Sequence, residues 1–289
     1  MIIDSHAHYN NSAYKKPFRY LTYGRDGYAL AEGERQQLLE ALLAAEIPYS
    51  IEPGVNLESS REVLELAAQY PGRIFPAVGV HPTRSIFEKW SERKNLDAYA
   101  QSPGVIAIGE TGLDYHYKRE EQHRLKQHLW FLYQLDLAWR MKKPVILHVR
   151  DAHEDALRIL RLHPARKYGG VIHCFYGNAK IARKYLALGY HIGIGGAILQ
   201  PEERAKDLWA AIAEIPLDRI LVETDAPYIL PYCKDVIPPK QLRRARNTSL
   251  ILPAVIEKIA RIKGLSPAAV ERATAENVIK CFTLPVAMA

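Results

Sequence analysis

Histidines and carboxylates recur along this 289-residue chain where short apolar runs end. The first two, His6 and His8, are two residues apart, a spacing that puts both side chains on one side of an extended segment. Imidazole nitrogens and carboxylate oxygens are ligands that suit Zn²⁺, Mn²⁺, Fe²⁺ and similar ions. The residues with this chemistry in this position are His6, His8, Glu110, His148, His173 and Asp225. We therefore expect one or two divalent metal ions, and the sequence does not distinguish among Zn, Mn, Mg, Fe and Ni.

Two carboxylates of this set have further expected roles. Glu110 stands alone among the histidines and could bridge two ions that lie close together. Asp225 could bind one ion and still accept a proton from the attacking water, which is the position of a general base. We therefore expect Glu110 and Asp225 to be catalytic as well as metal-binding. His81 also follows an apolar run, and we expect it to contact the substrate, with a local hydrogen bond as an equal alternative.

A single histidine near a strand end is more often structural than a metal ligand. Several histidines and carboxylates at equivalent ends of a repeating architecture are much harder to explain by chance. His116 lies in a loop on the same face and could contact substrate or bond locally. We expect four other histidines to be structural or exposed: His123, His128, His163 and His191. His153 follows Asp151 at an expected helix start, too far along the chain to be counted as a ligand.

The elements that would position these residues repeat along the chain. Runs rich in Ile and Val alternate with longer segments of helical spacing, a pattern typical of parallel strands covered by helices. The expected strands are residues 2–6, 48–52, 74–80, 105–109, 145–148, 171–174, 191–194 and 220–223. Eight such units predict an α/β fold, a (β/α)8 TIM barrel, with a doubly wound open sheet as the alternative. The C-terminal strand ends of a barrel converge on one face, where the six residues would meet.

The segments between and after the strands complete this architecture. Two helical segments, 249–263 and 267–282, follow the eighth strand and are expected to close the outer ring. No linker, low-complexity tract or repeated motif marks a boundary, so we expect residues 1–289 to form a single domain. The clearest helical segment has five apolar residues along one stripe: Leu125, Leu129, Leu132, Leu135 and Trp139.

Composition excludes several classes of protein. The chain is 48% hydrophobic and 25% charged, as in ordinary globular proteins and unlike disordered or fibrous ones. Its three cysteines form no C-x-x-C pair, which argues against a disulfide framework and a zinc ribbon. No apolar run has the length of a membrane span, and His6 and His8 leave no room for a cleavable signal peptide, so we expect a cytoplasmic protein. The formal net charge of +7 favours an anionic partner without identifying one.

The motifs around these residues resemble those of the TatD-type metal-dependent deoxyribonucleases, within the amidohydrolase-like TIM-barrel hydrolases. The matching segments are DSHAH at 4–8, AVGVHP at 77–82, IGETGLDY at 108–115, PVILHVRDA at 144–152, HCF at 173–175 and ETDAPY at 223–228. They occur in the family's order and span nearly the whole chain. The resemblance implies one metal site formed by His6, His8, Glu110 and Asp225. It implies a second site that shares Glu110 and adds His148 and His173.

The chain also departs from the family pattern. Tyr9 stands where the family usually has leucine, Tyr176 where it has a small hydroxyl residue, and Thr248-Ser249 where it commonly has Glu-Pro. Loss of that glutamate removes part of the usual local hydrogen bonding. The segment after His8 is longer than is typical and mixes aromatic with basic residues: Tyr9, Tyr14, Phe18, Tyr20, Tyr23 and Tyr28 with Lys15, Lys16, Arg19 and Arg25.

This long segment is expected to lie beside the site. Its rings could stack on unpaired bases while Lys and Arg bind phosphates, or they could simply pack onto the barrel rim. The expected substrate is DNA, single-stranded or at strand ends, cleaved by an exonuclease whose metal-activated water attacks the phosphodiester. A hydrolase of a small ester, lactone, amide or phosphoester is the alternative, and a non-catalytic metal-binding scaffold is less favoured. Neither a membrane nor an obligate protein partner is indicated.

Overall fold

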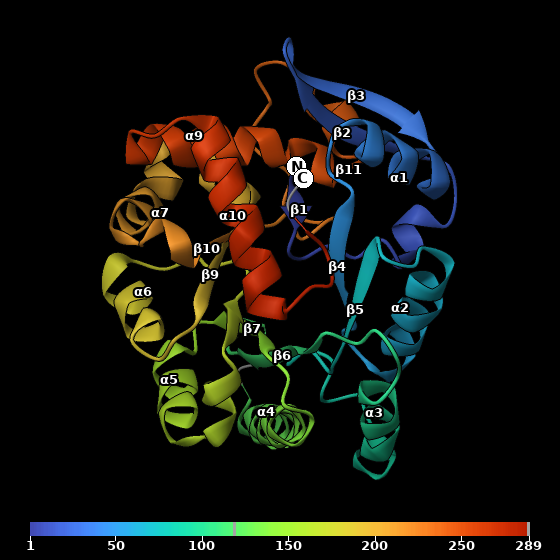
Figure 1. Cartoon of the computed structure of the whole chain (residues 1–289), viewed down its shortest axis with the longest axis vertical. Coiled ribbons are helices and arrows are strands. Elements are labelled where there is room, and N and C mark those ends of the chain that lie inside the picture. Colours follow the sequence, from blue (N-terminus) through green and yellow to red (C-terminus); the bar gives the residue numbers. More distant parts are fainter. Residues whose placement is uncertain (118–119, 288–289) are drawn as a thin grey trace.

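Eight parallel strands form the centre of the molecule in the computed structural model, which describes residues 1–117 and 120–287 (Figure 1). They lie side by side in the order β1-β4-β5-β6-β7-β8-β9-β10. The strands are β1 Ile3–Asp4, β4 Tyr49–Pro53, β5 Ile74–Val78, β6 Ala107–Asp114, β7 Val145–Arg150, β8 Gly170–Ile172, β9 His191–Ile194 and β10 Ile220–Val222. Each strand pairs with the next one along the chain, as a (β/α)8 barrel requires.

Backbone contacts join the last barrel strand to the first. The amide of Ser5 donates to the Val222 carbonyl at 3.0 Å. Ala7 and Ala226 form a parallel bridge just beyond the same two strands. The sheet therefore closes on itself, which confirms the predicted (β/α)8 fold and excludes the open, doubly wound alternative.

The strands lie close to their predicted positions, with one exception. β9 matches the prediction residue for residue, whereas β6 was expected to end at Gly109 and continues to Asp114. Glu110 therefore lies inside a strand rather than after it. The pairing of β6 with β7 shifts register between Ile108 and Thr111, and such irregularities redirect side chains.

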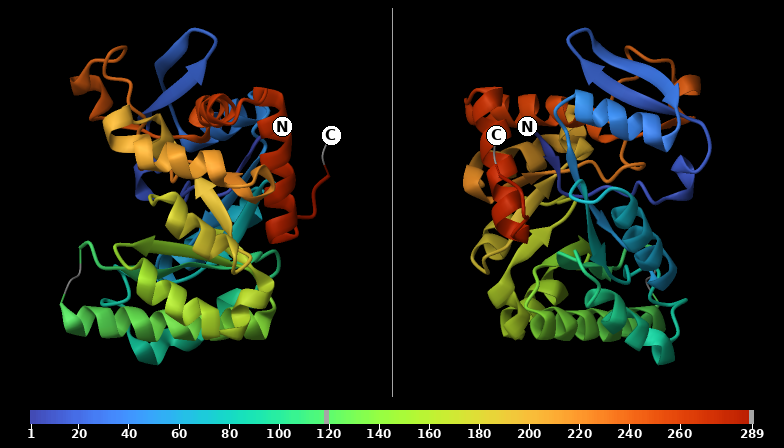
Figure 2. Two further views of the ribbon diagram at one scale, coloured as in Figure 1. Left: turned by 90° about the vertical axis from the view of Figure 1, so that its left-hand side faces the viewer. Right: turned by 45° about the vertical axis from the view of Figure 1, so that its right-hand side comes forward.

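Helices follow the strands and cover the outside of the barrel (Figures 1 and 2). They are α1 Arg35–Ala44, α2 Leu57–Gln69, α3 Arg93–Ala100, α4 Glu121–Met141, α5 His153–Leu162, α6 Ala179–Leu186, α7 Glu202–Glu214, α8 Pro239–Leu242, α9 Leu252–Lys263 and α10 Pro267–Phe282. Among the described residues, no helix is both long and apolar enough to cross a membrane.

The last helix does not extend the outer ring as predicted. α10 crosses in front of the strands in Figure 1, and its Val278 and Phe282 pack in one cluster with Ile3 of β1 and Phe75 of β5. Asn277 on the same helix donates to the carbonyl of Ile220, where β10 begins, at 2.8 Å. α10 therefore covers the N-terminal end of the barrel, the end away from the predicted site.

The apolar stripe predicted on α4 is helical but lies mostly at the surface. Leu125, Leu129, Leu132 and Trp139 are exposed, and of the five only Leu135 is fully buried. The buried face instead includes two glutamines, and each of them pairs with the backbone beyond or within a barrel strand. Gln134 exchanges hydrogen bonds with Val80, and Gln127 does the same with Asp114. Polar residues face the barrel here because they satisfy these backbone groups, so hydrophobicity alone misplaces the face.

The long segment after His8 forms part of a second sheet rather than a loop. β2 Phe18–Gly24 and β3 Gly27–Gly33 make a hairpin (Figure 2). β11 Ala245–Arg246 pairs with β2. Four of its aromatic side chains are buried, which favours the packing alternative for these rings: Tyr9, Tyr14, Phe18 and Tyr20.

Candidate metal centre

All six predicted ligands meet at the C-terminal ends of the barrel strands. Glu110 and His148 lie within strands, whereas His6, His8, His173 and Asp225 lie just beyond the strand ends. The ligands come from β1 and its extension (His6 and His8), β6 (Glu110), β7 (His148), the end of β8 (His173) and the end of β10 (Asp225). Residues far apart in the sequence thus share one buried pocket.

The Glu110 carboxylate lies between two groups of histidines. Its Oε2 is 3.6 Å from His6 Nε2 and 3.8 Å from His8 Nε2. Asp225 Oδ1 lies 3.7 Å and 3.4 Å from the same two nitrogens. The nitrogens themselves are 3.1 Å apart. Two ligands of a tetrahedral ion, each about 2.0 to 2.1 Å from it, would be separated by about 3.3 Å, so this spacing suits a cation.

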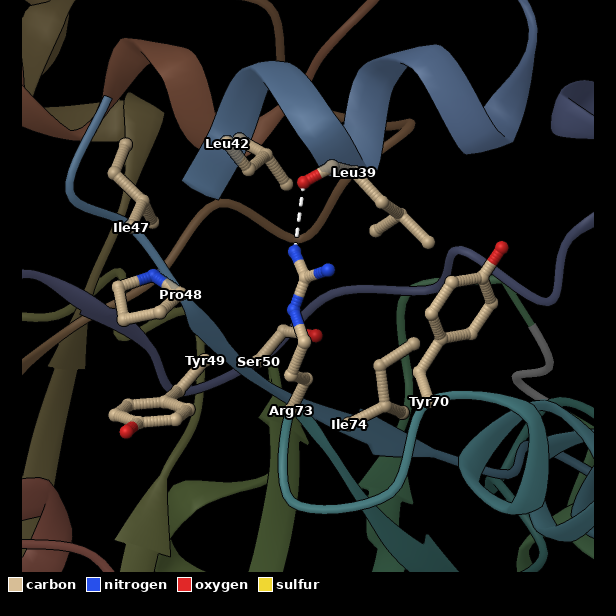
Figure 3. Close-up of a pocket in the computed structure, with 9 residues that line it drawn as sticks. All are labelled: Leu39, Leu42, Ile47, Pro48, Tyr49, Ser50, Tyr70, Arg73 and Ile74. Atoms are coloured by element: carbon tan, nitrogen blue, oxygen red, sulfur yellow. Dashed lines mark hydrogen bonds between the residues drawn. The ribbon is translucent and has the colours of Figure 1, made fainter. Parts of the chain in front are cut away.

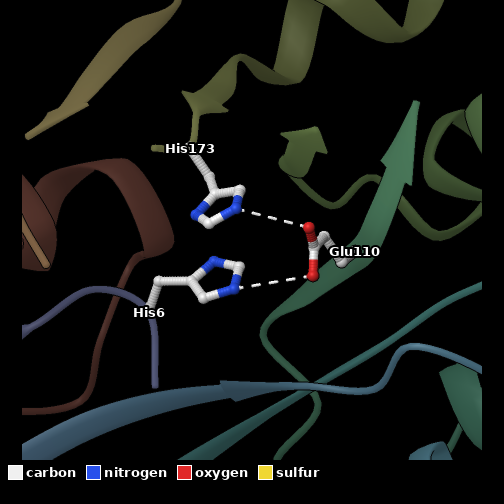
Figure 4. Close-up of side chains that lie close together, drawn as sticks. All are labelled: His6, Glu110 and His173. Carbon is white, nitrogen blue, oxygen red and sulfur yellow. Dashed lines mark ion pairs between the residues drawn. The ribbon is translucent and has the colours of Figure 1, made fainter. Parts of the chain in front are cut away.

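The other oxygen of Glu110 faces the second group. Glu110 Oε1 is 3.1 Å from His148 Nδ1 and 3.3 Å from His173 Nε2. Figure 4 shows His6 and His173 approaching the carboxylate one above the other, each opposite a different oxygen, and their stacked rings are 3.7 Å apart. One carboxylate therefore contacts both groups, which is the arrangement that a bridging ligand needs.

Hydrogen bonds on the far side of two rings indicate where their protons are. His8 Nδ1 lies 3.1 Å from the Pro53 carbonyl, and His148 Nε2 lies 3.1 Å from Asp114 Oδ2. An ionised carboxylate and a carbonyl only accept, so these nitrogens donate. In the neutral ring the opposite nitrogen then has a lone pair, and that of His148 faces an oxygen of Glu110. Two facing lone pairs repel, so the gap between them requires a proton or a cation, and a divalent ion fits the donor set.

The same contacts shift the pKa values of the carboxylates. Burial favours the neutral form of Glu110, but the imidazoles of His173 and His148 outweigh it and hold the pKa of Glu110 well below its ordinary value. Burial is likewise outweighed at Asp225, where His8 lowers the pKa of the carboxyl group. Both carboxylates therefore stay ionised, the form that binds a cation.

His81 reaches the same pocket, but the ring nitrogen that faces Glu110 has the proton, whereas that of His148 has a lone pair. The Thr83 amide donates to His81 Nδ1 at 3.1 Å, so this nitrogen accepts and the neutral ring has its proton on Nε2. Burial lowers the pKa of His81 to about 3, which keeps the ring neutral. Its Nε2 lies 3.3 Å from Glu110 Oε1. A donor in this position suits a substrate oxygen better than a cation.

Three carboxylates that contact the predicted ligands were assigned no function from the sequence. Asp114 contacts His148, Glu223 Oε1 lies 3.2 Å from His173 Nδ1, and Asp4 accepts a hydrogen bond from the His6 amide at 3.1 Å. Asp114 follows Glu110 by four residues in the same strand, and this even spacing was the available signal. Asp4 and Glu223 adjoin predicted ligands, but only the folded chain shows which groups they contact.

The histidines that were set aside lie outside the ligand groups found among the described residues. His116 Nδ1 pairs with Asp151 at 2.9 Å, so the structure shows a local bond for it. His128 is half-buried, and its Nε2 lies 2.6 Å from the Tyr115 hydroxyl. The expectation that His128 is solvent-exposed is therefore wrong. His191 opens β9 at the opposite end of the barrel, as expected.

A cleft of about 470 Å³ opens over the ligand groups. Its floor includes His8, Glu110, His148, His173 and Asp225. The volume is within the range of small-molecule sites, roughly 300 to 1,000 Å³. The cleft therefore leaves room for a substrate directly above the candidate metal ligands.

A smaller pocket lies at the other end of the barrel, between α1 and the starts of β4 and β5 (Figure 3). Its walls are largely apolar and include Leu39, Leu42 and Ile74. Among the described residues that line it, Arg73 is the only charged one, and its Nη2 donates to the Leu39 carbonyl at 2.7 Å. We assign no chemistry to this pocket, because its lining contains no group of metal-binding or nucleophilic side chains.

Comparison with known proteins identifies the family. The model of a family described as TatD related DNase matches residues 3–283. The chain belongs to this family. A TatD protein of Erwinia billingiae (strain Eb661), named 3'-5' ssDNA/RNA exonuclease, is 36% identical over 254 residues, which are 87% of this chain and 94% of that protein. The predicted family is therefore confirmed.

Further relatives agree on the enzyme class and the fold. YabD of Bacillus subtilis (strain 168), named an uncharacterized metal-dependent hydrolase, is 29% identical over 287 residues, 98% of this chain and all 100% of that protein. The crystal structure of YJJV, a TatD homolog from Escherichia coli K12, superimposes with a TM-score of 0.82 at 25% identity and covers 98% of each chain. The prediction of a metal-dependent hydrolase on a (β/α)8 barrel is confirmed for this TatD family member.

Proposed function

We propose that this protein is an exonuclease that removes nucleotides from the 3' end of single-stranded DNA with the help of bound divalent metal. The observation that carries the proposal is the position of Glu110, whose two oxygens face two separate groups of imidazole nitrogens. The substrate class is taken from TatD relatives such as that of Erwinia billingiae, whose name also includes RNA. The net charge of +7 suits a polyanionic substrate.

The metal would be held by the six converging residues. His6, His8, Glu110 and Asp225 would hold one ion, and Glu110, His148 and His173 a second. Bound divalent ions lower the pKa of a water molecule and stabilise negative charge on phosphoryl oxygens. Cys174 adjoins His173, and burial raises the pKa of its thiol above the ordinary value.

The chain's own groups would orient the substrate and move the proton. Asp225 is ionised and lies at the edge of the cleft floor, where it can accept a proton from the attacking water. Glu110 fixes the spacing between the two ligand groups. His81 would donate a hydrogen bond from its Nε2–H to a nonbridging phosphate oxygen, because its other ring nitrogen accepts from the Thr83 amide.

Two broader expectations also remain proposals. We propose that residues 1–289 act as one domain, because the hairpin sheet packs directly on the barrel through buried rings such as Phe18 and Tyr20. A cytoplasmic location is proposed from cysteine usage. Cys174, Cys233 and Cys281 are all free thiols, and a reducing compartment would keep them so.

One assay tests the proposed activity. Metal-reconstituted protein is incubated with 5'-labelled single-stranded DNA and, separately, with a panel of chromogenic small esters, lactones and phosphoesters. Stepwise shortening from the 3' end with release of mononucleotides, absent in His148→Ala, is the expected result. Turnover of small substrates alone would refute the nuclease and favour a small-molecule hydrolase instead.

A further inference from the structure

The rim of the cleft has aromatic rings and arginines side by side. Phe87, Tyr117 and Tyr228 line the cleft, yet 68%, 64% and 52% of their respective surfaces are exposed. Arg84 and Arg150 line the same cleft. We call these five residues the rim cluster. Large exposed rings gathered in one concave site are typical of a binding surface, because soluble proteins rarely leave such apolar groups together in contact with water.

Two members of the rim cluster contact residues of the candidate metal centre. The Tyr228 ring packs edge-on against His8, with centroids 6.1 Å apart. The Tyr117 amide donates to Asp114 Oδ1 at 3.3 Å, and the other oxygen of Asp114 contacts His148. The Tyr228 ring and the Tyr117 backbone are therefore linked to opposite ligand groups of the candidate centre.

The other three members of the rim cluster are Arg84 and Phe87, in the turn after His81, and Arg150, which contacts Tyr117. The Arg84 amide donates to the His81 carbonyl, and the Phe87 amide donates to the Arg84 carbonyl, both at 2.9 Å. The Arg150 guanidinium lies 4.9 Å from the centre of the Tyr117 ring and donates to its hydroxyl at 3.2 Å. Both arginines are thus attached, through neighbouring residues, to the turns that surround the centre.

This combination matches the chemistry of an unpaired nucleotide. Bases stack on aromatic rings whatever their sequence, and guanidinium groups bind phosphates through two parallel hydrogen bonds. The three acidic residues that line the cleft, Glu110, Asp114 and Asp225, all face the imidazoles below. Among the described residues that line this cleft, the rim therefore presents only cationic and neutral groups to a phosphate.

We propose that the rim cluster is the subsite for the unpaired nucleotides on either side of the scissile phosphate. The rings stack on the bases, and Arg84 and Arg150 bind the adjoining phosphates. This subsite rests on the proposed function, because it takes the substrate to be a single strand. It adds named contacts that would set affinity independently of the metal ligands.

The charges next to the cleft indicate which way the strand leaves. Beyond Tyr228 a neighbouring cleft is lined by Glu58 and Glu62, and Lys15 is paired with Glu62 at 2.6 Å. Lys15 offsets the charge of Glu62, and Glu58 adds a further carboxylate that repels phosphates. The strand would therefore leave across the side that holds Tyr117 and Arg150.

Binding of defined oligonucleotides tests the subsite. In a metal-loaded Asp225→Asn background, a 5'-fluorescein-labelled oligothymidylate is compared by fluorescence anisotropy with the same oligomer ending in an abasic residue at the 3' end. Tyr117→Ala should weaken binding of the ordinary oligomer roughly ten-fold and leave binding of the abasic oligomer nearly unchanged. Tyr117→Phe keeps the ring and should bind like the parent. Arg150→Ala should reduce the salt dependence of binding.

The control is Trp139→Ala, which removes an exposed ring on α4, outside the lining of the cleft. It should bind both oligomers as the parent does. Equal weakening of both oligomers by Tyr117→Ala, or no detectable binding by the parent, would overturn the subsite.

Activity of the otherwise wild-type protein separates the two proposals. Shortening of single-stranded DNA that is unaffected by Tyr117→Ala and Arg150→Ala would overturn the subsite and leave the exonuclease standing. Binding as predicted, without release of mononucleotides by the wild type, would support the subsite and overturn the exonuclease.

Discussion

Tyr9 and Ser249 are 240 residues apart in the sequence, and their hydroxyl oxygens lie 2.6 Å apart in the fold. The Ser249 amide also donates to the Tyr9 hydroxyl, at 2.9 Å, and the Ser249 hydroxyl donates to Asp4 at 2.6 Å. Both residues depart from the family pattern, and the two departures are bonded to each other. Together they supply local hydrogen bonds where the family's glutamate is missing, next to the backbone that positions His6.

This relationship predicts coupled effects on stability. Tyr9→Phe and Ser249→Ala should each lower the free energy of unfolding by about 1 to 3 kcal/mol, because each leaves a buried polar partner unsatisfied. The double variant should lose less than the sum of the two single losses, by about 1 kcal/mol. Urea unfolding of the four proteins measures this coupling. Strictly additive losses would show that the two hydroxyls do not stabilise each other.

Most of the candidate site could be predicted because its chemistry recurs at equivalent strand ends. His148, His173 and Asp225 each follow or end an apolar run, and a barrel brings such ends together whatever the loops do. Asp114 and the pair of Tyr9 with Ser249 could not be assigned in this way. Their roles depend on which groups from distant segments face them, and only the tertiary fold decides that.

The fold was predictable to the same extent, and the predictions of β6 and of the buried face of α4 were wrong for related reasons. Strand order follows from alternation of apolar runs with helices, but the extension of β6 past Gly109 contains Glu110, Thr111 and Gly112, which do not form an apolar run. On α4, Gln127 and Gln134 face the barrel because they pair with backbone groups. Hydrophobic periodicity does not predict such hydrogen bonds between side chains and backbone.

Asp114 should control the metal affinity of the second ligand group. It accepts from His148 Nε2, so Asp114→Ala frees the ring to rotate or change tautomer and should weaken metal binding about 10- to 100-fold. Titration of metal-free protein with Mn²⁺ or Zn²⁺ measures this change. Asp97→Ala, which removes a surface partner of Arg140, is the matched control and should bind metal normally. Unchanged affinity in Asp114→Ala would contradict the supporting role.

Asp225 should separate chemistry from metal binding. Asp225→Asn keeps the shape and one ligand oxygen but removes the proton acceptor, so hydrolysis should fall roughly 10²- to 10⁴-fold. Much of the bound metal should remain, because His6, His8 and Glu110 are intact. Mononucleotide release and metal content are measured on the same preparation. Wild-type turnover in this variant would refute the role of Asp225 as general base.

His81 should affect substrate and leave the metal in place. Its Nδ1 accepts from the Thr83 amide, so its Nε2 donates and is not a metal ligand in this form. His81→Phe should therefore raise KM or lower kcat for single-stranded DNA, with metal content equal to that of the wild type. Elemental analysis alongside steady-state kinetics distinguishes the two roles. Loss of one equivalent of metal would identify His81 as a ligand instead.

His191 predicts a dependence of stability on pH that is independent of the metal site. It is buried where β9 begins, and burial lowers its pKa to about 4 in the folded state, below the ordinary value of about 6.5. As the pH falls from 6.5 towards 4, the unfolded chain takes up a proton that the folded chain does not. The native state should therefore lose at most about 3 kcal/mol relative to a His191→Gln variant. Urea unfolding of both proteins at pH 7.5 and 4.5 measures this difference, and parallel losses would contradict it.

The central claim is that one carboxylate serves both ligand groups, and metal stoichiometry tests it most directly. Wild type, Glu110→Ala and His148→Ala are stripped, reconstituted with Zn²⁺ or Mn²⁺, dialysed and assayed for bound metal. We predict that Glu110→Ala loses nearly all bound metal, because Glu110 faces both groups, whereas His148→Ala loses only the metal of the second group. Metal content in Glu110→Ala equal to that of the wild type would contradict the account.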